Sequence, residues 1–70
     1  MSRRVEALPP VSIGDVECVK QTERAILVII DGSEHWVPQS QITADSEVYA
    51  MGHHGTLVVS GWLAKSRGWA

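Results

Sequence analysis

The stretch that decides the fold is residues 24–38, RAILVIIDGSEHWVP, in which two apolar-rich runs flank the pair Asp31-Gly32. Asp-Gly is favoured at positive φ and is the strongest short signal for a β-hairpin. The sequence therefore predicts strands over residues 24–30 and 33–38, joined by a tight turn. The first of these strands is apolar on both faces, whereas a half-exposed antiparallel strand alternates, so both of its faces should be covered.

Short β-branched runs separated by turn residues extend this pattern in both directions. They predict three further strands, over residues 15–21, 47–51 and 56–60. In the first of them Val16, Cys18 and Lys20 should share one face. Pro38 should end its strand, because it has no N–H to donate.

The remaining connections follow from turn and capping residues. We predict turns at residues 22–23, 39–41 and 52–55. Ser60 is suited to cap a short helix over residues 61–67, and Gly68 to end it. Five short strands and one helix predict a mainly β protein: a small five-stranded bent sheet or an SH3-like or OB-like barrel with a short C-terminal helix. Residues 1–12 are expected to form a flexible arm and residues 13–70 a single domain.

Composition excludes several classes of protein. The chain has 70 residues and a mass of 7.7 kDa, which is too short for a dinucleotide-binding fold or an α/β barrel, and it has no Gly-rich phosphate loop. Leu, Ile and Val number 18 of 70 residues and the net charge is only −2, so the chain should fold. The acidic balance argues against duplex nucleic acid as a partner.

Cys18 is the single cysteine, so an internal disulfide is impossible and the thiol should be buried. No apolar run approaches the roughly 18 residues of a membrane span, and the first residues lack the apolar centre of a signal peptide. We therefore expect no membrane partner and a location in the cytosol.

A core this small supplies only about 3–5 kcal/mol of stability. Because the strand over residues 24–30 is apolar on both faces, we predict a homo-oligomer, a dimer or a tetramer, in which a second copy covers one face. The alternative is that the arm and the helix cover that face within one monomer.

Residues 36–42, WVPQSQI, combine an aromatic ring, a rigid proline and three polar side chains. Trp36 can stack on a base, while Gln39, Ser40 and Gln41 can bond to phosphate oxygens or base edges. The alternative is structural: Trp36 belongs to the core, and Ser40 and Gln41 satisfy backbone groups of the turn.

Other candidates are a basic residue and a histidine pair. Arg24 begins a strand beside a turn, and its guanidinium suits phosphate recognition. His53 and His54 should rim a pocket, since adjacent residues on a strand point to opposite faces and are poorly placed to share a metal ion. We predict no metal, no cofactor and no catalysis, because no nucleophile, base and orienting group stand at a diagnostic spacing.

The runs RAILVIIDGSEHWVPQSQI (residues 24–42) and GTLVVSGWLAKSRGW (residues 55–69) resemble short phage and prophage proteins of the anti-CBASS nucleotide-sponge family. The resemblance implies a phage-encoded oligomer that binds an immune nucleotide signal without hydrolysing it. This chain has Gln39 where the pattern is expected to carry Lys, which removes a charge directed at phosphate.

The sequence thus predicts a non-enzymatic sponge that sequesters a cyclic dinucleotide or an ADP-ribose-type signal through Arg24, the Trp36–Gln41 segment and the histidine pair. The alternative is a small SH3-like or OB-like module that binds single-stranded nucleic acid or a host protein, with Trp36 and Tyr49 as platforms.

Overall fold

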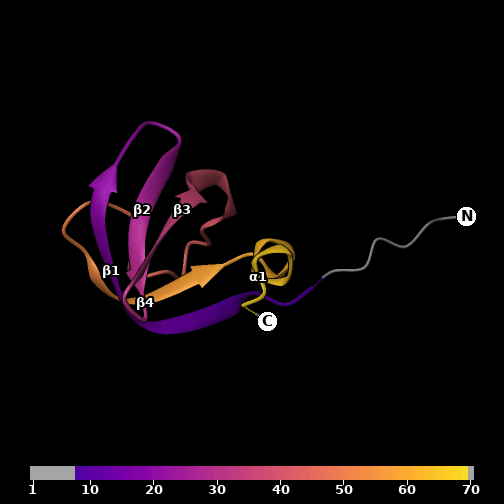
Figure 1. Ribbon diagram of the computed structural model, residues 1–70. Helices are drawn as coiled ribbons and strands as arrows, with labels where there is room; N and C mark the ends of the chain where they lie inside the picture. Colours follow the sequence, from indigo (N-terminus) through magenta and orange to yellow (C-terminus); the bar gives the residue numbers. More distant parts are fainter. Residues whose placement is uncertain (1–7, 70) are drawn as a thin grey trace, which may run out of the picture.

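A computed structural model describes residues 8–69 and shows a mainly β fold with one short helix at its C-terminal end (Figure 1). Four antiparallel strands form one open sheet in the order β3-β2-β1-β4. The prediction of a mainly β protein with a C-terminal helix is confirmed. The elements are β1 (Val11–Gln21), β2 (Ala25–Ile30), β3 (Ser33–Pro38), the 3₁₀ turn η1 (Gln39–Gln41), β4 (His54–Val59) and α1 (Gly61–Arg67).

The predicted β2–β3 hairpin forms as expected. Its turn residues both have positive φ, 52° at Asp31 and 80° at Gly32, and the strands pair without interruption from Ala25–Pro38 to Ile30–Ser33. Pro38 fits at the end of β3 because the next residue, Gln39, donates its N–H to the Arg24 carbonyl oxygen at 2.7 Å. Backbone groups alternate along a strand, so the proline nitrogen faces the open edge of the sheet, where no ladder bond is lost.

Strand β1 is longer than predicted, because it begins at Val11 rather than at residue 15. Val11 and Ser12 therefore belong to the sheet; residues 1–7 of the expected arm lie outside the described residues. Two register shifts bend the strand, one between Ile13 and Val16 and one between Cys18 and Lys20.

The second shift changes which face Lys20 occupies. Cys18 pairs with Val28, whereas Lys20 pairs with Leu27, the neighbour of Val28 on the other face of β2. The prediction that Lys20 shares a face with Cys18 is therefore wrong. The bulge inserts Val19 as an extra residue and reverses the alternation beyond it.

Within residues 8–69, residues 47–51 do not form the predicted fifth strand, and the sheet does not close into a barrel. The chain instead follows β4 irregularly, with Thr43 N–H bonded to Val58 O at 3.0 Å and Glu47 N–H to Thr56 O at 2.9 Å. Between these bonds the buried Ser46 hydroxyl accepts from Val58 N–H at 3.0 Å and donates to Val48 O at 2.8 Å. A side chain thus takes the place of the backbone ladder along this edge.

The core lies on one face of the sheet and includes residues of α1 and Val48 from the segment between η1 and β4. It is made of ten buried residues: Val16, Cys18, Ile26, Val28, Val37, Val48, Leu57, Val59, Leu63 and Ala64. Ile42 packs against it. The predicted burial of Cys18 is confirmed, and burial raises the pKa of its thiol.

On the other face of β2, Leu27 is only 6% exposed. Its cross-strand partners are Trp36 on β3 and Lys20 on β1, whose side chains stand on the same face. Neighbours within one chain therefore cover Leu27, so its burial does not require a second copy. The homo-oligomer stays a prediction.

Helix α1 has the predicted ends. The Ser60 hydroxyl accepts from Leu63 N–H at 3.2 Å, and Gly68 adopts the left-handed conformation with φ of 79°. Beyond it the edge of Trp69 packs against the His35 ring, with centroids 5.3 Å apart. No helix within residues 8–69 is long and apolar enough to cross a membrane.

Candidate ligand site on the outer sheet face

The face of the sheet that points away from the core carries the candidate site. We call this the outer sheet face and define it by Lys20, Leu27, Trp36 and Pro38. Lys20, Leu27 and Trp36 form one row across three neighbouring strands. Since neighbouring strands lie about 4.8 Å apart, the Cα atoms of Lys20 and Trp36 are about 10 Å apart, with the buried Leu27 between them.

Trp36 is 46% exposed. The structural alternative, in which its ring belongs to the core, is therefore wrong. Its backbone is held from the side of the helix, because Arg67 Nη2 donates to the Trp36 carbonyl oxygen at 2.8 Å. The arrangement fixes the strand under the indole and leaves part of the ring open to a stacking partner.

A hollow of about 390 Å³ lies at the end of β2 and β3 and is lined by Glu23, Arg24, Pro38, Gln39 and Ser40. Pro38 stands two residues from Trp36 on the same face of β3, about 6.7 Å along the strand. Pro38 thus belongs both to the outer sheet face and to the lining of the hollow, and the residues of the hollow are included in this face. Three of the predicted site residues, Arg24, Gln39 and Ser40, meet here.

Gln39 is held in this hollow by two bonds to the β1–β2 turn. Its side-chain amide donates to the Thr22 carbonyl oxygen at 2.6 Å, and its backbone N–H donates to Arg24 O at 2.7 Å. The turn itself is closed by the Thr22 hydroxyl, which accepts from Ala25 N–H at 3.0 Å. The position of the Arg24 backbone is therefore fixed, while its side chain and that of Ser40 are exposed.

Gln41 lies apart from this hollow. Its Oε1 accepts from the Ser60 hydroxyl at 2.5 Å, and its carbonyl oxygen accepts from Ser60 N–H at 2.8 Å. Because Ser60 caps α1, Gln41 links η1 to the start of the helix. This structural role differs from the predicted alternative, in which Gln41 satisfies backbone groups of its own turn.

The histidine pair lies on β4 and the turn before it. His53 Nδ1 accepts from Tyr49 N–H at 3.3 Å, which places the proton of the neutral ring on Nε2. Its ring meets Tyr49 edge to face at 4.4 Å. His54 is exposed and pairs with Glu17 in the register of β1 and β4.

Neither histidine lines the hollow that gathers Arg24, Gln39 and Ser40. In the described part of the chain, no three side chains of His, Cys, Asp or Glu are placed to hold a metal ion. The absence of a metal site and of catalysis stays a prediction.

Two residues of the site escaped the sequence analysis. Lys20 was assigned to the wrong face because a bulge leaves no simple mark in a strand pattern. Glu23 was treated only as a turn residue, although it lines the hollow. Pro38, which the sequence analysis placed in the candidate segment, also lines the hollow, and it shares a face with Trp36 because residues two apart in a strand do so.

The outer sheet face thus combines an open indole and the Lys20 side chain with a hollow lined by one basic, one acidic and two neutral polar side chains. Such a surface can stack a planar ring and bind an adjacent anion, as nucleotide sites do. The chain matches no known protein family, and comparisons with curated proteins and with solved structures find no similar protein.

Proposed function

We propose that this protein binds a small nucleotide on the outer sheet face and sequesters it without modifying it. The observation that carries the proposal is the position of the exposed Trp36 ring, which lies on the same strand face as Pro38, a residue that lines the hollow together with Arg24, Gln39 and Ser40. A base would stack on Trp36 beside Lys20, and the attached phosphate would meet the Arg24 guanidinium and the Ser40 hydroxyl.

The balance of charge favours a ligand with few negative charges. Arg24 and Lys20 are the basic residues of this face, and Glu23 lines the same hollow. Gln39 has a neutral amide at the position where the nucleotide-sponge family is expected to carry a lysine. A cyclic dinucleotide or an ADP-ribose-type signal spreads its phosphates among sugars and bases, which suits this mixture better than a nucleoside triphosphate.

In this proposal the protein is a phage-encoded sponge that acts in the host cytosol and blunts a nucleotide-triggered defence. Sequestration works by mass action, so the protein must bind the signal more tightly than the effector does. A dimer or tetramer would add copies of the site, and a seam next to the outer sheet face would enclose the ligand further.

A second candidate function rests on the openness of this surface. Trp36 on this face is 46% exposed, Tyr49 outside it is 57% exposed, and open aromatic rings also suit single-stranded nucleic acid or a host protein. The two candidates differ in the length of the ligand, which binding measurements can separate.

The test is calorimetric titration with cyclic dinucleotides, cyclic ADP-ribose isomers and a ten-nucleotide oligothymidylate. We expect one of the small nucleotides to bind and to be recovered intact by chromatography after heat denaturation. Oligothymidylate as the only binder would support the second candidate, and a hydrolysed or linearised nucleotide would identify an enzyme instead. No binding by any of these ligands would contradict the binding of a nucleotide and of single-stranded nucleic acid.

Matched variants locate the site. Arg24→Gln should weaken nucleotide binding by about 10-fold or more, because a hydrogen bond to a charged group contributes about 1.5–3 kcal/mol. Ser40→Ala should weaken it about fivefold, whereas Ser33→Ala, at the exposed far end of β3, should leave it unchanged. Gln41→Ala should lower the melting temperature with little effect on affinity, because Gln41 bonds to Ser60.

A further inference from the structure

A second surface, at the C-terminal end of the fold, is independent of the outer sheet face. Gly61 is buried against the segment that enters β1: a Cβ atom at this position would meet the Pro9 carbonyl oxygen and the Leu8 side chain. The backbones therefore approach as closely as only glycine permits. This contact holds residues 8–11 beside the first turn of α1.

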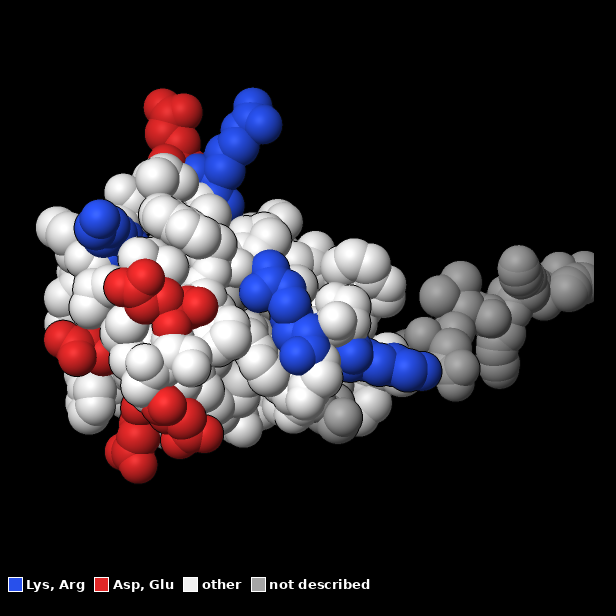
Figure 2. All heavy atoms as spheres, in the orientation of Figure 1, with Lys and Arg blue, Asp and Glu red and all other residues white. Residues whose placement is uncertain are grey.

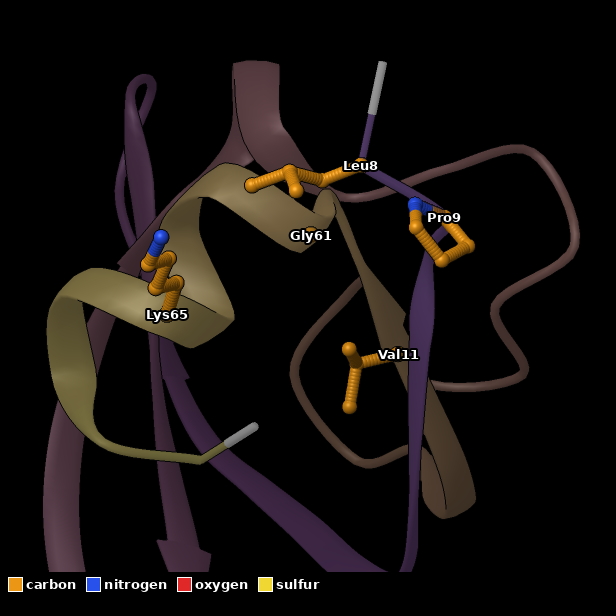
Figure 3. A pocket seen from close by; sticks show the side chains of 5 residues that line it. All are labelled: Leu8, Pro9, Val11, Gly61 and Lys65. Carbon is orange, nitrogen blue, oxygen red and sulfur yellow. The ribbon is translucent and has the colours of Figure 1, made fainter. Parts of the chain in front are cut away.

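A hollow of about 250 Å³ remains between these two segments, lined by Leu8, Pro9, Val11, Gly61 and Lys65 (Figure 3). Figure 3 shows the Leu8 side chain running over the first turn of α1 and the Val11 side chain pointing from β1 into the space beside the helix. All of the lining is aliphatic or backbone apart from the Lys65 ammonium group. Small-molecule sites typically measure about 300–1,000 Å³, so this hollow suits a single aliphatic side chain better than a whole ligand.

The surface around the hollow is also apolar. Trp62 is 64% exposed and Leu8 is 38% exposed. Trp62 and Lys65 stand three residues apart on α1, so they share one side of the helix. We call this surface, made of Leu8, Val11, Trp62 and Lys65, the α1 face. Tryptophan is enriched among the residues that contribute most to binding in protein interfaces.

Charge decides what kind of partner fits. Helix α1 carries Lys65 and Arg67 and no acidic residue, and Figure 2 shows basic side chains over this helix while acidic ones gather over the strands. The rest of the described chain has two basic residues against seven acidic ones, a net charge of −5. The ammonium group at the rim of an apolar hollow is complementary to a carboxylate beside an aliphatic side chain.

We propose that the α1 face binds a partner protein through an acidic segment that places one aliphatic side chain in the hollow and a neighbouring carboxylate on Lys65. The Trp62 indole covers the segment from the side. This interaction uses none of the residues of the outer sheet face, so it stands whether or not the protein binds a nucleotide.

The probes are three capped peptides: acetyl-Glu-Glu-Leu-Glu-Glu-amide, its lysine counterpart acetyl-Lys-Lys-Leu-Lys-Lys-amide, and acetyl-Glu-Glu-Gly-Glu-Glu-amide. Each is titrated into the labelled full chain and followed by nuclear magnetic resonance. The acidic leucine peptide should shift the signals of Val11, Gly61 and the Trp62 indole, and should bind about 10-fold more tightly than the other two. Equal binding of all three, or shifts elsewhere only, would overturn the proposal.

A charge reversal provides the matched control. Lys65→Glu should invert the preference, so that the lysine peptide binds more tightly than the glutamate peptide. Lys20→Glu changes the net charge equally but lies on the outer sheet face, and it should keep the original preference. Identical effects of the two variants would overturn the proposal, because the preference would then follow net charge alone.

Light scattering separates a partner from a second copy. The α1 face should be open in solution, so Trp62→Ala should leave the oligomeric state of the protein unchanged. A dimer that Trp62→Ala dissociates would overturn the proposal, because the occupant of this face would then be another copy of the chain.

Discussion

The outer sheet face and the α1 face differ in how the fold holds them. The outer sheet face rests on continuous pairing between β2 and β3, and its central Trp36–Leu27–Lys20 row crosses three strands. The α1 face depends on one close approach, between Gly61 and the segment at Leu8 and Pro9. The first surface is thus supported by many cooperating hydrogen bonds, whereas the shape of the second depends on the close packing at Gly61.

The two surfaces also differ in chemistry. The outer sheet face offers a flat aromatic ring with basic and neutral polar groups, whereas the α1 face offers an aliphatic hollow with one ammonium group. They should therefore select different classes of ligand, a nucleotide and an acidic protein segment. Substitutions should impair one surface while sparing the other.

The largest loss of stability is expected when the Leu27 side chain, which packs beside Trp36, is shortened. Leu27→Ala should lower the free energy of unfolding by about 2–4 kcal/mol, because Leu27 is nearly buried between Trp36 and Lys20 and its loss leaves a cavity. Urea titration measures this loss. The half-buried Ile29, on the same face of β2, is the control, and Ile29→Ala should cost clearly less.

This variant also tests the independence of the two surfaces. Leu27→Ala should weaken nucleotide binding, since the indole loses its underlying contact, while the acidic leucine peptide should bind as before under conditions in which the protein is folded. A parallel loss of peptide binding in the folded variant would mean that the surfaces are coupled.

The second effect concerns the contact that shapes the α1 face. Gly61→Ala should lower the free energy of unfolding by about 1–3 kcal/mol, because the added methyl group displaces the backbone at Pro9. The Leu8 and Val11 signals should move and peptide binding should fall. Gly14 is the matched control, because a Cβ atom there meets nothing within 4 Å, and Gly14→Ala should change stability little. Similar losses in both variants would contradict the packing argument.

The contrast between the surfaces also shows what a sequence pattern can predict. The β2–β3 hairpin was predictable because Asp31 and Gly32 determine the turn chemistry locally, and α1 because Ser60 and Gly68 mark its ends. The predicted strand over residues 47–51 does not form, because a tertiary contact competes with it. Ser46 turns its hydroxyl to Val58 and replaces the backbone ladder that the pattern at residues 47–51 had indicated.

The candidate site was predictable where it depends on neighbours in sequence, as with Gln39 and Ser40 after Trp36. It was not predictable where it depends on register, since the bulge at Val19 moves Lys20 to the other face. The α1 face was missed altogether. It arises from the approach of Gly61 to Leu8, which are 53 positions apart in the chain.

A smaller effect on stability is expected from Cys18, which lies in the core beneath both surfaces. Burial raises the pKa of the Cys18 thiol, so the folded state holds its proton to higher pH than the unfolded chain does. The stabilisation is fully present below the ordinary thiol pKa of 9.0 and is lost as the pH rises above it. Urea titrations from pH 8 to pH 10 should show this decline, and Cys18→Ala should reduce it. An unchanged slope in that variant would assign the decline to other groups.

The smallest loss of stability is expected when Arg67 is replaced. This substitution also tests most directly whether the outer sheet face and the α1 face are independent. Its guanidinium bonds to the Trp36 carbonyl oxygen at 2.8 Å and lies 5.6 Å from the Trp69 ring centroid, so it joins the end of α1 to the strand that carries the indole. Because the side chain is exposed, Arg67→Ala should cost less than about 1 kcal/mol of unfolding free energy. The carbonyl remains accessible to water, and the β2–β3 pairing still orients Trp36, so nucleotide affinity should change by less than about threefold.

Calorimetric titration of a nucleotide into Arg67→Ala and Arg67→Lys measures this change in affinity. A loss of 10-fold or more in nucleotide binding, restored by Lys, would show that α1 positions Trp36 and that the two surfaces act as one.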